Sequence, residues 1–424
     1  MNRFMVKIML SAAVLLTLAG TASAETVKGR LKAIAGELKL FSLATGQEKV
    51  LVISWNDKTA WKGLNNSDEL KLDEILSVDF RLSNDFPVAI SVARIKTPLP
   101  AGIKVTSLEQ VAEGLSDKEG SSSFTLVDTR AVELYDAGHI PGAVSLALSR
   151  LEKRTSGLLP EKKDTRLVFY DEGQGGDSAG KAAELAAKAG YTESAVYRGG
   201  AAEWADSGKQ LASSTAFIRK KRPAVIDIRS REQAALGHIE KAANYPLPEL
   251  KDYLGSLPMN KLTPIVIYGA LDQEAATAAE IIRTRGYRRV TIYPGGASSW
   301  EKNAEVLERG PAGEEISLKA ANHGGAMSPN DFELALASPV MVEIVDVRPV
   351  ADHKKGGFPH AKQIPLPDLP KRAGELNRDK IQVLFAADPM LAEMAYDYLK
   401  SKGFKLNFLI GSVEFQNDGK YIVK

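Results

Sequence analysis

An acid, an arginine and a histidine recur three times along the chain, and such side chains can form a catalytic or ion-binding group. The three sets are Asp128, Arg130 and His139; Asp227, Arg229 and His238; and Asp346, Arg348 and His360. The acid and the histidine lie 11 residues apart in the first two sets and 14 apart in the third. A set that recurs at domain-length intervals indicates an internal repeat, so one interpretation must serve all copies.

The same predicted elements position each set. A short apolar strand ends at the aspartate, a helical segment follows, and a glycine-rich turn carries the histidine. Each copy then continues with a second apolar strand, a loop, a helix and a further strand. Strands that alternate with helices predict an α/β fold, in which a parallel sheet is flanked by helices on both faces.

The stretch TLVDTRAVELYDAGHIPGA, residues 125–143, resembles the opening half of a rhodanese domain, where D-x-R is followed by a helix and G-H-I-P-G-A. The second half of each copy is similar to the family's apolar strand, catalytic loop C-x-x-G-x-R, helix and terminal G-G…W. The resemblance covers about three quarters of the chain. It implies three tandem rhodanese-like domains, whose histidines are structural residues of the turn.

The resemblance also locates the catalytic cysteine, and none of the three positions holds one. They are occupied by Asp171, Gly269 and Ala386, and the chain has no cysteine at all. The arginine of the family loop is replaced by Asp177, Glu274 and Leu391. Only a thiolate can carry a transferable persulfide, so we expect no sulfurtransferase activity and predict no catalytic residue.

The loops at these positions supply the candidate ligand-binding residues. They are Gly173, Gly175, Gly176, Asp177 and Ser178 in the first copy and Asp272 and Glu274 in the second. The acids would repel an anionic substrate. A capping role explains them better: Asp177 or Ser178 would cap a helix from Ala179, and Asp388 a helix from Met390.

Composition excludes several further functions. Without cysteine there is no disulfide, thiolate zinc site, thioether haem or lipidated cysteine. The histidines lie in separate copies, so we predict neither a metal nor a cofactor. The 55 basic and 53 acidic residues almost cancel, which disfavours nucleic-acid binding.

Residues 1–24 resemble a signal peptide, with Arg3 and Lys7 before an apolar run and Ala22–Ala24 as the cleavage site. No second apolar run is long enough to span a membrane. We therefore expect a soluble periplasmic protein that is not a lipoprotein.

The first domain differs from the rest. Residues 25–98 show short alternating stretches typical of a small β-barrel, similar to oligonucleotide/oligosaccharide-binding (OB) barrels. Trp55 and Trp61 could form a stacking platform there, although half-buried barrel aromatics are the favoured interpretation. The predicted rhodanese-like domains are 103–213, 214–309 and a degenerate third at 316–424.

These observations favour a non-catalytic binding or scaffold protein in the bacterial envelope, with a respiratory or electron-transfer assembly as one partner class. Two alternatives are a sulfur or selenium oxyanion-handling protein with a non-cysteine site, and a small-ligand carrier that uses the Gly173–Asp177 loop or the barrel. The sequence does not identify the partner, the pathway or the oligomeric state.

Overall fold

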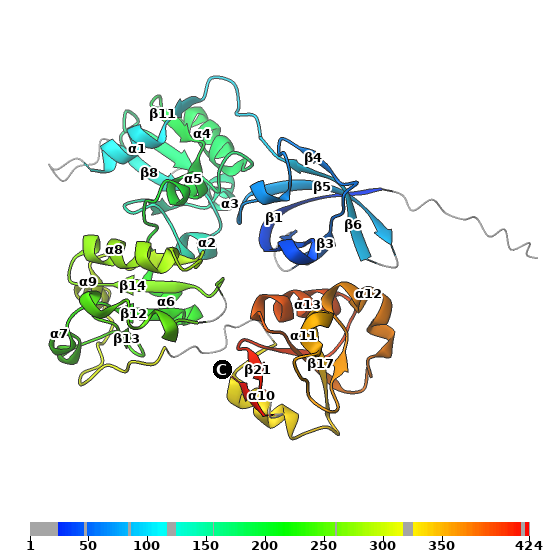
Figure 1. The fold of residues 1–424 in the computed structure, drawn as a ribbon. Helices are drawn as coiled ribbons and strands as arrows, with labels where there is room; N and C mark the ends of the chain where they lie inside the picture. Colours follow the sequence, from blue (N-terminus) through cyan, green and yellow to red (C-terminus); the bar gives the residue numbers. More distant parts are fainter. Residues whose placement is uncertain are drawn as a thin grey trace, which may run out of the picture.

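The computed structural model describes residues 24–45, 49–83, 86–116, 124–155, 157–258, 261–316, 325–416 and 420–423. All but the last residue of the predicted signal peptide lies outside these ranges. Four sheet-containing bodies follow one another along the chain: a barrel and three units in which helices flank a sheet (Figure 1). Within the described ranges, no helix has the length and apolarity needed to cross a membrane.

The N-terminal body is a closed barrel of five strands, as expected, with a short sixth strand added. The strands are β1 (Glu25–Ala35), β2 (Leu40–Ala44), β3 (Val50–Ser54), β4 (Ala60–Lys62), β5 (Ile75–Ser83) and β6 (Phe86–Arg94). The order β3-β2-β1-β5-β6 is closed by a parallel β3–β6 pair, and β4 also pairs with β6. Trp55 is buried in the core, stacked on Phe41 with ring centroids 5.7 Å apart and edge-on to Trp61, as expected for barrel aromatics.

Unit 1 has a five-stranded sheet whose pairs are all parallel, in the order β7-β11-β10-β8-β9. Its strands are β7 (Lys104–Thr106), β8 (Thr125–Asp128), β9 (Val144–Ser145), β10 (Leu167–Tyr170) and β11 (Ser194–Tyr197). Its helices are α1 (Leu108–Leu115), α2 (Val132–Ala137), α3 (Leu148–Lys153), α4 (Ser178–Lys188) and α5 (Gly200–Asp206). The central strand β10 is apolar and wholly buried, and its neighbour β8 is buried from Leu126 to Asp128, as expected for a sheet covered on both faces.

Unit 2 repeats this arrangement with the order β13-β12-β14-β15. Its strands are β12 (Ala224–Asp227), β13 (Ala243–Asn244), β14 (Ile265–Tyr268) and β15 (Val290–Ile292). Its helices are α6 (Thr215–Lys221), α7 (Arg231–Leu236), α8 (Asp272–Arg283) and α9 (Gly296–Lys302). The position that β7 has in unit 1 is taken by Leu211–Ser213, because Ala212 forms a parallel bridge with Ile292.

Unit 3 has the order β16-β20-β19-β17-β18, which matches unit 1 position by position. Its strands are β16 (Ala326–Met327), β17 (Val342–Asp346), β18 (Lys362–Gln363), β19 (Ile381–Phe385) and β20 (Leu406–Leu409), followed by a hairpin of β21 (Val413–Phe415) and β22 (Tyr421–Val423). Its helices are α10 (Pro329–Leu336), α11 (Val350–His353), α12 (Leu369–Arg372) and α13 (Pro389–Ser401). Short 3-10 helices lie at Gly36–Leu38, Ser67–Glu69, Leu247–Glu249, Leu254–Ser256, Leu366–Asp368 and Ala373–Glu375.

The barrel packs against unit 3 through α13. Phe86 of the barrel meets Tyr398 edge-on, with ring centroids 5.4 Å apart, and both residues belong to one apolar core. Lys32 of β1 forms ion pairs at 2.9 Å with Glu393 and Asp397 of α13. The barrel is therefore joined to unit 3 by a shared core and a charged contact, although the two are distant in sequence.

Candidate functional site

The three aspartate–arginine pairs form the same clamp in every unit. In each pair Nε of the arginine donates to Oδ1 of the aspartate at 2.9 Å, and Nη2 donates to Oδ2 at 2.6 Å. The same Nη2 also donates at 2.7 Å to a glycine carbonyl, that of Gly138, Gly237 or Gly356. All three aspartates are fully buried. The arginine thus ties the strand end to the following turn, and the pairs maintain the fold instead of facing a substrate.

The clamp corrects the alignment of the third copy. The arginine and its glycine acceptor are eight residues apart in every copy, so Gly356 corresponds to Gly138. The residue that matches His139 is therefore Gly357, and His360 matches Gly142. Our expectation that His360 is the turn histidine was wrong, because the 14-residue spacing had placed it three positions too late. His360 is exposed.

The two remaining turn histidines have structural contacts. Nδ1 of His139 donates to the Tyr135 carbonyl at 2.9 Å, and Nδ1 of His238 donates to the Ala234 carbonyl at 3.1 Å. Burial lowers the pKa of His139. Within the described residues, no three or more His, Asp or Glu side chains come together as a metal site.

In unit 1 the side chain of Asp171 fills the loop that follows β10. Its Oδ1 accepts the Gly173 N–H at 3.1 Å, and its Oδ2 accepts the Ala179 N–H at 3.0 Å. A Cβ atom on Gly176 would lie 2.4 Å from the carboxyl group, so only glycine fits over it. Backbone N–H groups at the start of a helix form an anion site, and here the chain's own carboxylate occupies that site.

The first two acids of this loop are removed from water to different degrees, since Asp171 is buried and Glu172 is half-buried. Burial raises the pKa of Asp171, against the opposing effect of its two backbone donors. Burial, followed by the nearby charge of Asp171, also raises the pKa of Glu172. Two adjacent shielded carboxyl groups oppose the entry of a further anion.

Helix α4 is capped, but the prediction that Asp177 or Ser178 supplies the cap was wrong. Asp177 occupies the N-cap position, but its side chain makes no capping hydrogen bond and pairs with Lys181 at 2.7 Å. The side chain of Asp171, seven residues before the helix begins, accepts the Ala179 N–H instead. The cap therefore comes from the residue at the cysteine position.

The barrel covers the same loop from outside. Thr97 donates its N–H to the Gln174 carbonyl at 3.0 Å and its hydroxyl to the Gly175 carbonyl at 2.9 Å. A Cβ atom on Gly175 would lie 2.8 Å from Cβ of Ile75. Arg198 Nη2 donates to both the Thr97 and the Gln174 carbonyls. Of the candidate residues of unit 1, Gly175 therefore lies at an interface within the molecule.

In the corresponding loop of unit 2, the two acids accept hydrogen bonds from backbone N–H groups. Gly269 is buried, and a Cβ atom there would lie 3.1 Å from Ile228. Asp272 Oδ1 accepts the Gly295 N–H at 2.7 Å, and Glu274 Oε2 accepts the Leu271 N–H at 3.3 Å. Both acids thus bind the backbone of their own unit.

The loop of unit 3 is closed by packing. Ala386 is fully buried. Asp388 accepts the Met390 N–H at 2.9 Å, which confirms its predicted capping role. Leu391, at the position of the family arginine, packs against the apolar core that unit 3 shares with the barrel. This loop therefore presents an apolar side chain where an anion site would need a cation.

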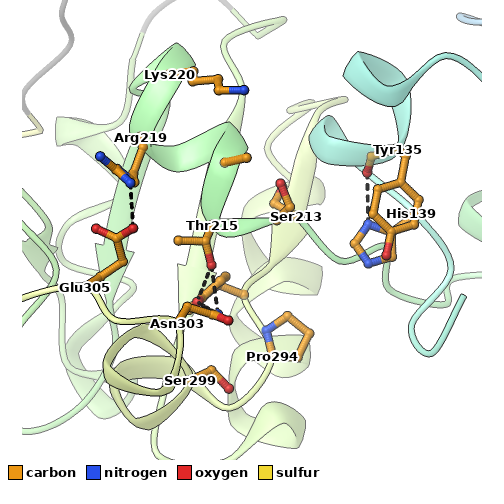
Figure 2. Close-up of a pocket in the computed structure, with 13 residues that line it drawn as sticks. Tyr135, His139, Ser213, Thr215, Arg219, Lys220, Pro294, Ser299, Asn303 and Glu305 are labelled. Carbon is orange, nitrogen blue, oxygen red and sulfur yellow. Dashed lines mark hydrogen bonds and ion pairs between the residues drawn. The ribbon is translucent and has the colours of Figure 1, made fainter. Parts of the chain in front are cut away.

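The predicted site residues thus form three separate loops, and no single site unites them. The structure also reveals a cleft of about 710 Å³ between units 1 and 2 (Figure 2). Tyr135 and His139 lie on one side of it and Arg219 and Lys220 of α6 on the other. Sequence reasoning missed it because its residues come from different copies, and the basic stretch of residues 219–222 was the one available signal.

Two hydroxyl pairs lie beneath this cleft, one between the units and one within unit 2. The Ser213 hydroxyl lies 2.7 Å from that of Thr291, and the Thr215 hydroxyl lies 2.8 Å from that of Tyr293. Arg219 is paired with Glu305 at 2.8 Å (Figure 2). The cleft is polar and open, and its floor is part of the contact between the units.

Comparison with known proteins finds similarity to rhodanese-like domains and to sulfurtransferases. A family profile described as "Rhodanese-like domain" matches residues 107–207 and 214–303. The thiosulfate sulfurtransferase PspE of Escherichia coli K12 is 32% identical over 66 residues, which are 16% of this chain and 61% of PspE. The uncharacterized protein YibN of the same strain is 30% identical over 98 residues, 23% of this chain and 68% of YibN.

Among these relatives, PspE is matched over less than two thirds of its own length. Among solved structures, a thiosulfate sulfurtransferase from Pseudomonas aeruginosa is similar at 18% identity and a TM-score of 0.23. That match covers 75% of this chain and 67% of the other.

Proposed function

The chain belongs to the rhodanese-like domain family, and on that premise we propose that it is a non-catalytic binding or scaffold protein of the bacterial envelope. In this proposal residues 103–213, 214–309 and 316–424 are three rhodanese-like units, the third degenerate. The residues after the central strands no longer transfer sulfur, and the surfaces of the units bind another protein.

One observation carries the non-catalytic part of the proposal. At the cysteine position of unit 1, Asp171 accepts two of the backbone N–H groups of its own loop. A carboxylate is a poor nucleophile for sulfur and cannot form a persulfide. The same position holds glycine in unit 2 and alanine in unit 3, neither of which offers a reactive side chain.

The envelope location rests on residues 1–24, whose basic start, apolar run and small-residue end are typical of a signal peptide. It is tested by mass spectrometry of protein purified from a periplasmic extract, where we expect the mature chain to begin at Glu25. A full-length chain recovered with the cytoplasm would contradict this part of the proposal.

The enzymatic part is tested by assaying the purified protein with thiosulfate and cyanide. We expect thiocyanate to form no faster than in buffer, and turnover above that rate would contradict the non-catalytic role. The binding part is tested by cross-linking in envelope extracts at native abundance, where one partner should be recovered reproducibly. Failure to recover any partner would count against a scaffold.

A small-ligand carrier is the second candidate function, and the cleft between units 1 and 2 favours it over the predicted Gly173–Asp177 loop, which the barrel covers. Lys220 lines this cleft and makes no ion pair with any described residue. A thermal-shift screen with small anions tests this function. We expect any stabilisation to be lost in Lys220→Met and kept in Lys251→Met, an exposed control.

A further inference from the structure

Units 1 and 2 end in the same way. After its last helix, each chain segment turns back and pairs with the histidine turn of its own unit. Residues 210–214 do this in unit 1 and residues 306–310 in unit 2. A residue in the first segment corresponds to the one 96 positions later in the second, so Ala212 corresponds to Glu308.

Each segment makes four hydrogen bonds within its own unit, and the four bonds are equivalent in the two units. The N–H groups of His139 and Ala212 bond each other's carbonyls at 2.9 and 2.8 Å, as do those of His238 and Glu308. The Ser214 N–H donates to Asp136 at 3.0 Å, and the Gly310 N–H donates to Ala235 at 2.9 Å. Trp204 and Trp300 donate their ring N–H groups to the carbonyls of Gln210 and Val306, at 2.9 and 3.1 Å.

The outward edges of the segments differ. In unit 1 the Ile292 N–H of β15 donates to the Leu211 carbonyl at 2.9 Å, and the Ser213 N–H donates to the Ile292 carbonyl at 2.9 Å. The equivalent groups in unit 2 are the Leu307 carbonyl and the Arg309 N–H. Neither bonds to any residue that the structure describes.

The side chains beside the two segments also differ: they are packed in unit 1 and exposed in unit 2. Ala137, beside the covered segment, packs against the core of unit 2. Its counterpart Leu236 is 80% exposed, and Val306 is 85% exposed. Two large exposed apolar side chains thus flank a backbone edge whose outward hydrogen-bonding groups have no partner among the described residues.

From this repeat we infer that residues 306–310, together with Leu236, form a docking edge for an extended strand of a partner protein. The strand would run parallel to residues 307–309, as β15 runs along Leu211–Ser213. Its chemistry would be that of β15, with β-branched residues at the centre. Addition of a strand to an open sheet edge is a common mode of peptide recognition.

Within the described part of the chain, the strands equivalent to β15 are already paired on the corresponding side. In units 1 and 3 the strands that correspond to β15 are β11 and β20, which pair with β7 and β16. β15 itself is covered by Leu211–Ser213. A second copy could offer only this same edge and no free strand equivalent to β15, so we assign the strand to another protein. The inference rests on the proposed binding role and names its surface.

A labelled peptide with the sequence of residues 288–294, RRVTIYP, is the probe, because it copies the strand that covers the equivalent edge in unit 1. Titrated with the full chain, it should bind saturably and slow hydrogen exchange at the Arg309 amide. Arg309→Pro removes the outward donor and should weaken binding roughly fivefold to tenfold. Val306→Asp should weaken it similarly, and Val350→Asp, at an exposed position in unit 3, should not.

The proposed docking edge is contradicted if the peptide fails to bind at about 1 mM. It is also contradicted if the Arg309→Pro and Val306→Asp variants bind the peptide as tightly as the unchanged protein does. Self-association that Arg309→Pro abolishes would also overturn it, in favour of a second copy. If Arg309→Pro misfolds, Val306→Asp decides. If the peptide binds but no envelope partner is recovered, only the scaffold role is contradicted. If a partner is cross-linked but the peptide does not bind, only the docking edge is contradicted.

Discussion

The carboxylate of Asp171 accepts the backbone N–H of Ala179 at 3.0 Å, so the residue at the cysteine position caps the helix that follows it. In the rhodanese-like family this loop would hold an anion beside a thiolate. Here a negatively charged group, built into the chain, satisfies the N–H groups. The loss of the cysteine therefore coincides with a substitution that stabilises the empty loop.

Asp171→Ala should destabilise unit 1 by about 1–3 kcal/mol, because the buried N–H groups of Gly173 and Ala179 lose their acceptor. Sulfate or thiosulfate should then recover part of the loss by binding to the vacated cradle, and should not stabilise the unchanged protein. Thermal unfolding with and without these anions measures both effects.

Asp388→Ala is the matched control, since it removes an exposed cap at the equivalent helix of unit 3. It should cost about 1 kcal/mol and show no recovery with anions. If Asp171→Ala is as stable as the unchanged protein in every buffer, the carboxylate does not satisfy the loop.

The stability of the protein should depend on pH through the raised pKa values of Asp171 and Glu172. Burial raises the folded-state pKa of Asp171 above 3.8 and that of Glu172 above 4.5. A group with a raised folded-state pKa stabilises the protein below its unfolded pKa, and this contribution is lost as the pH rises through the folded value. The double variant Asp171→Asn, Glu172→Gln should therefore lose less stability than the unchanged protein between about pH 4 and pH 7.

Unfolding midpoints across this range provide the measurement. Asp79 provides the opposite control, because hydrogen bonds from Ser91 and Thr26 lower its pKa. Asp79→Asn should lower stability most at the upper end of the range. Parallel curves for the double variant and the unchanged protein would show that neither acid is shielded in solution.

The buried clamps should dominate the stability of each unit. Arg130→Ala leaves the fully buried Asp128 without its partner, and we expect a loss of about 3–5 kcal/mol. Arg372→Ala breaks an exposed ion pair with Glu375 and should cost at most about 1 kcal/mol. Hydrogen exchange of amides in β8 and β19 separates the two effects by unit. Equal losses would contradict the structural role of the clamp.

The sequence predicted the features that depend on short-range patterns. The strand ending in Asp128 and Arg130, the cap at Asp388 and the closed barrel all follow from local residue order. It failed at His360, because the histidine was used as the marker, whereas the feature that all three copies share is the bond from the arginine to the glycine carbonyl. It also failed at Asp177, because the true capping residue, Asp171, reaches the helix only when the loop folds back.

The contact between the barrel and unit 1 shows why the sequence did not predict how the domains pack against one another. It joins residues 75 and 175, which no periodicity or motif connects, and it depends on the absence of a side chain at Gly175. A glycine in a loop reads as a turn residue or an anion-binding residue. Only the folded arrangement shows that it accommodates another domain.

Gly175→Val should separate the barrel from unit 1, because its Cβ atom would lie 2.8 Å from Ile75 and 3.1 Å from the Ile95 carbonyl. Overpacking of this kind costs about 1–3 kcal/mol, and here movement of the barrel can relieve it. We expect faster hydrogen exchange at the Thr97 amide and earlier proteolysis near residues 97–100, with the core of unit 1 unchanged. Gly255→Ala, where an added Cβ meets nothing within 4 Å, is the control. Unchanged exchange at Thr97 in Gly175→Val would show that the barrel does not rest on this loop in solution.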